Sequence, residues 1–391
     1  MERCKHVIDE ANTLGVYLHV PFCSTSCDFC AFYQEQSDRK GILAYLDGID
    51  RELEMIERTG PVHTIFWGGG TPGLLPAKDL DRLCRAVVAK FGRPELEWTV
   101  EMAPSSVKAD KLKALRDNGV TRISMGVQSL DDRALEALGR NHSRKQVLKA
   151  YDLVREIGFD SVNLDMIFAV PGQTRDQWRA DLREVVGLEP DHISTYCLTF
   201  EEDTALYVKL SEGKVSIDIE KEADFFHISW EEMATAGYEQ YEISNYAKPG
   251  HACLHNRHTW RMAEWIGVGP SAASQEAGWR YSNSSDLKVW QDELAKGVRG
   301  TSDRSELSDG ILFEDSLIFG LRMNDGVDLA ALEKRFEMQL PESARGIVDN
   351  LVAEEKLEEC GDVYRLTSDG RMVADAIGEA LLGCFVEECS E

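Results

Sequence analysis

Between residues 16 and 204, short apolar runs alternate with stretches whose apolar residues recur at helical spacing. The runs are rich in β-branched and aromatic residues, and they span 16–20, 63–67, 97–101, 122–126, 161–168 and 192–197. Helical stripes are formed by Leu80, Leu83, Val87 and Phe91 after Pro76, and by Val147, Tyr151, Val154 and Ile157. Strands that alternate with helices predict an α/β fold with a parallel sheet. The pattern leaves open whether this sheet curls into a barrel or stays open and doubly wound.

The alternation of strand-like and helical patterns stops after residue 204. Residues 205–300 combine an acidic helical stretch with aromatic, glycine-rich segments that we read as loops. Residues 301–391 are mostly helical, with a hairpin that turns at Gly361 and Asp362. We therefore expect a core over 1–204, an extension over 205–300 and a small, mainly helical, winged-helix-like domain over 301–391.

Composition and charge restrict the function. The chain has 391 residues, of which 43% are hydrophobic, and a formal net charge of −26. Such an acidic protein repels a phosphate backbone, so we expect no nucleic-acid partner. The first residues lack the apolar core of a secretory signal, and no run is long enough to span a membrane, although peripheral membrane contact stays open. Ten cysteines in such a chain indicate reduced thiols and a cytoplasmic location.

Three of the cysteines, Cys23, Cys27 and Cys30, lie within eight residues directly after the first predicted strand. Buried structural cysteines would rarely cluster this closely. A zinc site with His19 as fourth ligand is a second interpretation, although structural zinc more often uses paired C-x2-C motifs. An iron–sulfur cluster fits better, because closely spaced thiolates in one loop ligate such clusters. Three thiolates leave one iron open for a ligand such as S-adenosylmethionine.

Polar or glycine residues also follow the other predicted strands. Gly68, Gly69 and Gly70 follow the second strand, Glu101 ends the third, and further polar residues at the ends of strands four to six are Gln128, Asp165 and Tyr196. Carboxyl ends of parallel strands share one edge, where sites in such folds form. We therefore expect these residues and the cysteines to share a site.

These motifs resemble the radical SAM superfamily, and within it the coproporphyrinogen III oxidase-like branch. The spacing C-x3-C-x2-C and the segment "GGGTP" match the superfamily's cluster and methionine motifs. The resemblance implies a partial (β/α)6 barrel and a [4Fe-4S] cluster on Cys23, Cys27 and Cys30. It also implies contacts with S-adenosylmethionine from Tyr17, Gly69, Gly70, Thr71, Glu101, Gln128, Arg140 and Asp165.

Two features favour the heme-chaperone branch of this family over the oxidases. Phe32 stands where the oxidases carry a further cysteine, and "HNRHTW" (255–260) resembles the branch's H-N-x-x-Y-W heme-binding motif. His255 is then the candidate heme ligand, with His258 nearby as an alternative. The chain departs from the motif at Thr259, and Ala273 stands where a histidine is common.

The resemblance therefore implies a chaperone that binds a [4Fe-4S] cluster, S-adenosylmethionine and heme, and that passes heme to apo-hemoproteins. The alternative is an oxygen-independent coproporphyrinogen III oxidase, or another radical SAM oxidoreductase that acts on a tetrapyrrole. A zinc-stabilised binding module without redox chemistry is the rival from another class. The sequence leaves open whether the protein is an enzyme.

Overall fold

The computed structural model describes residues 13–36, 38–58 and 61–385. Predictions that concern residues 1–12, including the absence of a secretory signal, lie outside these residues. No helix in the described part of the chain is both long and apolar enough to cross a membrane.

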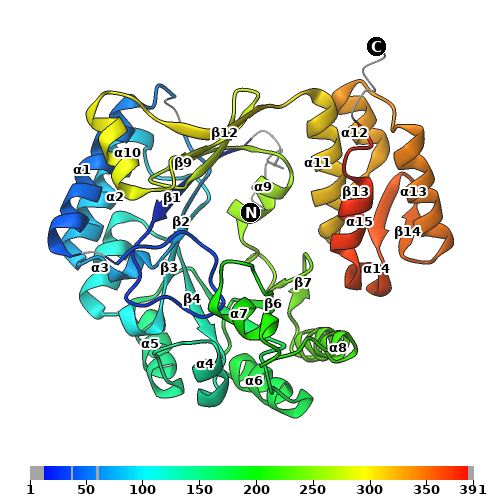
Figure 1. The fold of residues 1–391 in the computed structure, drawn as a ribbon, viewed down its shortest axis with the longest axis horizontal. Helices are drawn as coiled ribbons and strands as arrows, with labels where there is room; N and C mark the ends of the chain where they lie inside the picture. The colour runs from blue at the N-terminus through cyan, green and yellow to red at the C-terminus, as the bar shows by residue number, and fades with distance from the viewer. Residues whose placement is uncertain (1–12, 37, 59–60, 386–391) are drawn as a thin grey trace, which may run out of the picture.

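Six parallel strands in sequence order form the centre of the molecule (Figure 1). They are β1 (Leu14–Val20), β2 (Thr64–Gly69), β3 (Glu97–Met102), β4 (Arg122–Gln128), β5 (Ser161–Phe168) and β6 (His192–Cys197). The connecting helices are α1 (Arg39–Met55), α2 (Ala77–Phe91), α3 (Ala109–Asn118), α4 (Asp132–Ala137), α5 (Arg144–Ile157) and α6 (Arg175–Gly187), with the single turns η2 (Pro72–Leu74) and η3 (Pro104–Ser106). All six predicted strands and both predicted helical stripes are confirmed.

The main core lies between the sheet and its covering helices. Val16, Leu18 and Val20 of β1 are fully buried, as expected for a parallel strand with an apolar outer face. Leu80, Leu83 and other stripe residues of α2 and α5 belong to the same core. Because this face is filled by aliphatic and aromatic side chains, the opposite face of the strands is left for polar side chains.

The prediction of loops between residues 237 and 285 is wrong. This region contains β7 (Glu239–Gln240), β8 (Asn245–Ala247), β9 (Glu264–Val268), β10 (Ala273–Glu276) and β11 (Trp279–Asn283), and β12 (Thr301–Glu306) follows. All of them join the central sheet, whose order is β12-β11-β10-β9-β1-β2-β3-β4-β5-β6-β8-β7. Such strands are too short to show a clear alternation, and pairing with the existing edges stabilises them. The sheet is curved and open, and its first and last strands do not pair.

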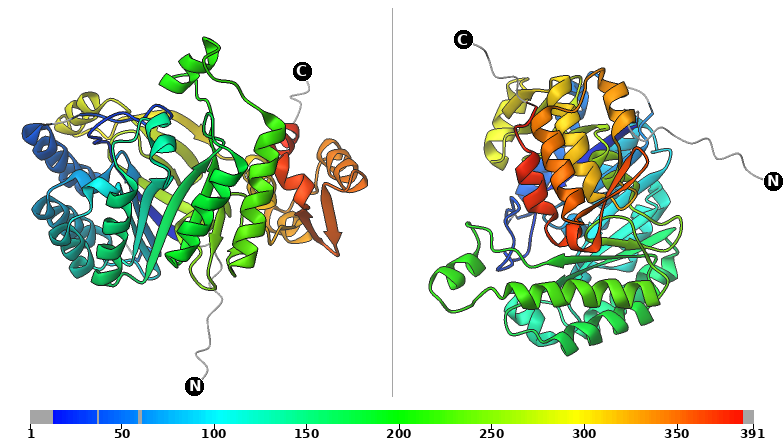
Figure 2. Two further views of the ribbon diagram at one scale, coloured as in Figure 1. Left: turned by 90° about the horizontal axis from the view of Figure 1, so that it is seen from below. Right: turned by 90° about the vertical axis from the view of Figure 1, so that its right-hand side faces the viewer.

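Three further helices accompany these strands: α7 (Ala205–Ser211), α8 (Ile219–Thr235) and α9 (Leu254–Trp260). Helix α8 packs on α6, and α7 projects from the body of the molecule (Figure 2). Helix α9 contacts β1 and β2, and α10 (Leu287–Ala295) packs against α1.

The C-terminal region has its own hydrophobic core. It contains α11 (Asp309–Arg322), β13 (Val327–Asp328), α12 (Leu329–Phe336), α13 (Glu342–Ala353), β14 (Leu357–Cys360), β15 (Val363–Leu366), α14 (Ser368–Met372) and α15 (Ala374–Leu381). The predicted hairpin is confirmed, since Cys360 pairs with Val363 across Gly361 and Asp362. Helices with a three-stranded sheet agree with the expected small, mainly helical unit.

Candidate cofactor site

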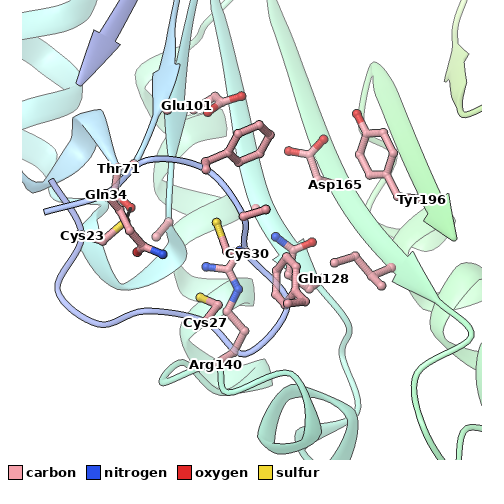
Figure 3. A pocket seen from close by; sticks show the side chains of 18 of the residues that line it. Cys23, Cys27, Cys30, Gln34, Thr71, Glu101, Gln128, Arg140, Asp165 and Tyr196 are labelled. Carbon is pink, nitrogen blue, oxygen red and sulfur yellow. Dashed lines mark hydrogen bonds between the residues drawn. The ribbon is translucent and has the colours of Figure 1, made fainter. Parts of the chain in front are cut away.

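A cavity of about 760 Å³ opens at the carboxyl ends of the parallel strands (Figure 3). Eleven predicted residues line it: Cys23, Cys27, Cys30, Gly69, Gly70, Thr71, Glu101, Gln128, Arg140, Asp165 and Tyr196. They come from all six parallel strands or the segments that follow them. The expected convergence on one edge is confirmed for the nine that the strand ends predicted, whereas Thr71 and Arg140 were predicted from the resemblance.

The loop that carries the cysteines is anchored at several points. The backbone N–H of Cys23 donates to the carbonyl of Glu35 at 3.0 Å, and that of Asp28 donates to Leu138 at 3.2 Å. The Asp28 carboxylate also pairs with Lys209 of α7 at 2.6 Å. These contacts fix the loop at the cavity wall while all three thiols remain partly accessible and unoxidised.

Burial has the largest effect on the acidity of two of these thiols, and the Arg140 guanidinium opposes it. Burial raises the pKa of both Cys23 and Cys30, whereas the nearby Arg140 guanidinium lowers it. Binding to iron requires thiolates, and a fixed cation beside them favours that form.

A single tetrahedral metal does not fit this arrangement. In the described part of the chain, no three His, Cys, Asp or Glu side chains gather closely enough to hold one metal ion. His19 is engaged elsewhere, with Nε2 at 3.2 Å from the Tyr33 carbonyl and Nδ1 at 3.2 Å from the Tyr17 hydroxyl. Thiols spread over a loop suit the separate irons of a cluster better than one zinc ion.

The glycine triplet brings the backbone of β2 close to its neighbours. A Cβ on Gly68 would lie 2.9 Å from Glu101 Oε2, and one on Gly70 would lie 2.8 Å from the carbonyl oxygen of Phe22. Gly69 has φ +101° and its Cβ would meet the His19 ring at 2.5 Å. Any larger residue would displace the cysteine loop or the carboxylate.

Two carboxylates, Glu101 and Asp165, face the cavity from neighbouring parts of the sheet (Figure 3). Asp165 accepts hydrogen bonds from Asn163 Nδ2 at 2.8 Å and from Ser124 Oγ at 3.0 Å. Burial, followed by the charge of Asp165, raises the pKa of Glu101 to about 8. Such a pair can bind an ammonium group or sugar hydroxyls, which would stabilise the ionised form of Glu101.

Gln128 and Arg140 form the opposite wall. A register shift in β4 and a φ of 70° at Gln128 turn its side chain toward the cavity. A Cβ on Gly126 would lie 3.0 Å from Gln128 Nε2 and 3.3 Å from Arg140 Nη2, so this glycine makes room for both. Arg140 stacks over Phe29 at 5.5 Å, and its buried Nε has no hydrogen-bond partner. A guanidinium with an unpartnered buried N–H beside three thiols fits an anionic ligand.

Two predicted residues lie away from the cavity lining. Tyr17 points into the interior of the sheet, where its ring stacks on Phe66 at 6.4 Å and its hydroxyl contacts His19. His255 of α9 lies at the amino ends of the strands, near Gly15 and Thr64. The candidate heme ligand and the cysteines therefore lie at opposite ends of the parallel strands.

Several lining residues were not predicted. They include Phe29, Ala31, Phe32, Gln34, Gly126, Ile167, Cys197, Thr199 and Glu201. Their signal in the sequence was position alone, within a few residues of a cysteine or of the end of a predicted strand. Phe32 is 71% exposed at the rim, which is unusual for a large apolar side chain.

The comparisons with known proteins agree with this geometry. The Radical SAM superfamily profile matches residues 17–185, and the HemN C-terminal domain profile matches residues 312–373. The chain is 31% identical to "Heme chaperone HemW" of Bacillus subtilis, over 94% of this chain and 99% of that protein. It is 30% identical to "Heme chaperone HemW" of Escherichia coli, over 94% and 98% of the two chains.

A solved structure supports the fold. Coproporphyrinogen III oxidase (HemN) from Escherichia coli, described as a radical SAM enzyme, superposes with a TM-score of 0.82. The match covers 95% of this chain and 90% of that one at 21% identity. The superfamily implies a [4Fe-4S] cluster and S-adenosylmethionine, and the three thiols, Arg140 and the two carboxylates fit such ligands. The chain therefore belongs to the HemW family of the radical SAM superfamily.

Proposed function

We propose that this protein is a cytoplasmic heme chaperone that binds a [4Fe-4S] cluster, S-adenosylmethionine and heme, and that transfers heme to apo-hemoproteins. The observation that carries this proposal is the similarity to HemW proteins over nearly the whole of both chains. It includes the cysteine loop and α9.

The cavity residues have distinct tasks in this proposal. Cys23, Cys27 and Cys30 would hold the cluster, and Arg140 would balance its negative charge. Gly69, Gly70, Thr71, Gln128 and the two carboxylates would hold S-adenosylmethionine, whose ammonium group would pair with Glu101 or Asp165. When bound, the cluster and S-adenosylmethionine supply one-electron chemistry. Tyr17 does not line the cavity and would support S-adenosylmethionine binding through its contact with His19.

Phe32 argues for a chaperone rather than an oxidase. The oxidases that the sequence resembles have a cysteine at this position, whereas here an exposed phenyl ring reaches the cavity rim. The similarity to coproporphyrinogen III oxidase in three dimensions concerns the fold and does not favour that reaction.

The heme ligand would come from α9, at the other end of the sheet. His255 is only 6% exposed, its Nδ1 is 2.9 Å from Thr64 Oγ1, and its ring stacks on Phe66 at 5.4 Å. Burial lowers its pKa to about 3, so the imidazole is neutral and able to bind iron. Heme could reach it only after α9 shifts. His258, with its buried Nδ1 unpartnered, is the second candidate.

Anaerobic heme titration of the cluster-reconstituted protein tests this proposal. We expect a Soret shift with wild type and a weaker one with His255→Ala, while His227→Ala, at an exposed histidine of α8, behaves like wild type. Loss of binding in His258→Ala alone would assign the iron to that residue. No Soret shift with wild type would rule out the chaperone. Conversion of coproporphyrinogen III to protoporphyrinogen with reductant and S-adenosylmethionine would instead support the oxidase.

A further inference from the structure

A series of buried and partly buried hydrogen bonds runs from the cavity to α9. It starts at Asp165, whose Oδ1 accepts from Asn163 Nδ2 at 2.8 Å. Asn163 Oδ1 lies 2.6 Å from His192 Nδ1, and His192 Nε2 lies 2.8 Å from the Tyr241 hydroxyl. The Tyr241 oxygen accepts from the backbone N–H of Cys253 at 3.2 Å. Cys253 is the N-cap of α9, the helix that carries His255.

The donors in this series all point the same way. An amide oxygen only accepts, so His192 must carry its proton on Nδ1, and its Nε2 must then accept from the Tyr241 hydroxyl. Burial, followed by the charges of Arg122 and His251, lowers the pKa of His192 well below its ordinary value, which keeps the ring neutral. Each group donates toward Asp165, so the Asp165 carboxylate is the final acceptor of the whole series.

This series of hydrogen bonds is shielded from water over most of its length. Asn163, His192 and Cys253 are at most 1% exposed. In such an environment hydrogen bonds polarise one another, and a broken link leaves a buried polar group unsatisfied.

A second contact secures the same helix terminus. Glu97, the first residue of β3, accepts from the backbone N–H of Leu254 at 3.2 Å and of His255 at 3.4 Å. The N–H groups at the start of α9 are thus bound by the Tyr241 hydroxyl and the Glu97 carboxylate, while the N-cap residue Cys253 makes no side-chain capping hydrogen bond of its own. A shift in these groups would change how firmly α9 is docked.

We propose that Asn163, His192 and Tyr241 couple ligand binding at Asp165 to the docking of α9, and so to the accessibility of His255. None of the three lines the cavity, so they are positioning residues. A cation or hydroxyl bound to Asp165 withdraws charge from the carboxylate, weakens the hydrogen bond from Asn163 and loosens each following link. The part that concerns heme, and the choice of S-adenosylmethionine as the ligand at Asp165, rest on the proposed function, whereas the hydrogen-bonded path from Asp165 to α9 does not.

Hydrogen exchange of the amides in residues 253–260 tests the coupling without heme. The full-length, cluster-reconstituted protein is measured anaerobically, without reductant, with and without S-adenosylmethionine. In wild type we expect S-adenosylmethionine to change the α9 exchange rates about fivefold or more, the lower end of usual coupling between sites. Tyr241→Phe removes only the hydroxyl, and it should bring this change to within about twofold of none.

Tyr238→Phe is the matched control. Tyr238 is also buried, and its hydroxyl donates to the Pro190 carbonyl at 2.6 Å outside this series. It should keep the wild-type response, and binding of S-adenosylmethionine should persist in both variants. An unchanged response in Tyr241→Phe, or none in wild type that binds S-adenosylmethionine, would overturn the coupling.

Heme titration of the same variants separates the two proposals. We expect S-adenosylmethionine to shift the heme Kd of wild type by the same factor as the exchange rates, and not to shift that of Tyr241→Phe. If wild type binds no heme but the exchange response is present, the chaperone assignment fails and the coupling stands. If heme binds and neither measurement depends on Tyr241, the coupling fails and the chaperone assignment stands.

Discussion

The two ends of the parallel strands differ in how their candidate ligands are held. At the carboxyl ends, Cys23, Cys27 and Cys30 line an open cavity and their thiols are free. At the amino ends, His255 is enclosed by α9, Thr64 and Phe66. The open end is ready to receive a ligand, while the closed end must first give up existing contacts. Two candidate ligand motifs in one sequence can therefore differ greatly in the free energy needed to expose their side chains to a ligand.

The largest effect is expected from the cysteines. Cys23→Ala, Cys27→Ala or Cys30→Ala removes one of only three thiolates, so iron and sulfide per chain should fall to near zero after reconstitution. Cys360→Ser, at an exposed position in the C-terminal hairpin, should retain full iron content. Stoichiometric iron in any of the three alanine variants would mean that the open end is not the cluster site.

The next largest effect is expected from the glycine backbone that packs against the cysteine loop at the carboxyl ends of the strands. Gly70→Ala places a Cβ 2.8 Å from the carbonyl of Phe22, which cannot move without shifting the cysteine loop. We expect a loss of about 1–3 kcal/mol in stability and about tenfold in affinity for S-adenosylmethionine, measured by denaturant unfolding and calorimetry. Gly346→Ala, in α13 with open space around it, should instead gain up to about 1 kcal/mol. Equal behaviour of the two variants would contradict the close approach.

The closed end can be loosened at Thr64. Thr64→Val keeps the shape of the side chain but removes the hydroxyl beside His255 Nδ1, at a cost of about 1–3 kcal/mol in stability. Under the proposed function the apparent heme affinity should rise, because more molecules have a free His255 ring. A lower melting temperature with unchanged heme affinity would argue against His255 as the ligand.

The smallest effect is a change in pH dependence at Glu101. Its pKa of about 8 in the fold exceeds the ordinary 4.5, so the folded protein holds a proton that the unfolded chain releases. Stability from this group is present below about pH 4.5 and is lost as the pH rises to about 8. In Glu101→Gln, the decrease in the free energy of unfolding between pH 5 and pH 8 should be smaller by on the order of 1–2 kcal/mol, as measured by unfolding at the two pH values. Glu136→Gln, at an exposed site, should leave the profile unchanged, and a parallel shift of both variants would refute the assignment.

Long regular patterns made the central fold predictable. The six parallel strands and the stripes on α2 and α5 combine β-branched runs with helical spacing, and the described structure contains each of them. Strands β7 to β12 were missed because their residues, such as Trp279–Asn283, are mixed in character and pair with edges formed by other parts of the chain. Their stability comes from partners that a local pattern cannot reveal.

The candidate site was predictable to a similar degree. Residues that follow strands were expected to converge because parallel strands end at one edge, and nine of the residues predicted on that ground line the cavity. Gly126 could have been recognised only from its neighbours, since its role is to make space for Gln128 and Arg140. The enclosure of His255 likewise depends on Thr64, which lies 191 positions away in sequence.

The sequence by itself determined the parallel α/β core, the three-thiol motif and the family, because spacing and residue type are local properties. Only the tertiary structure decided that the sheet stays open, that the cysteines and carboxylates share one cavity, and that α9 closes the other end. Those features depend on contacts between residues far apart in the chain, such as the hydrogen bonds that join Asp165 to Cys253. Their geometry is set by the packing of the whole sheet and is not encoded in any single segment.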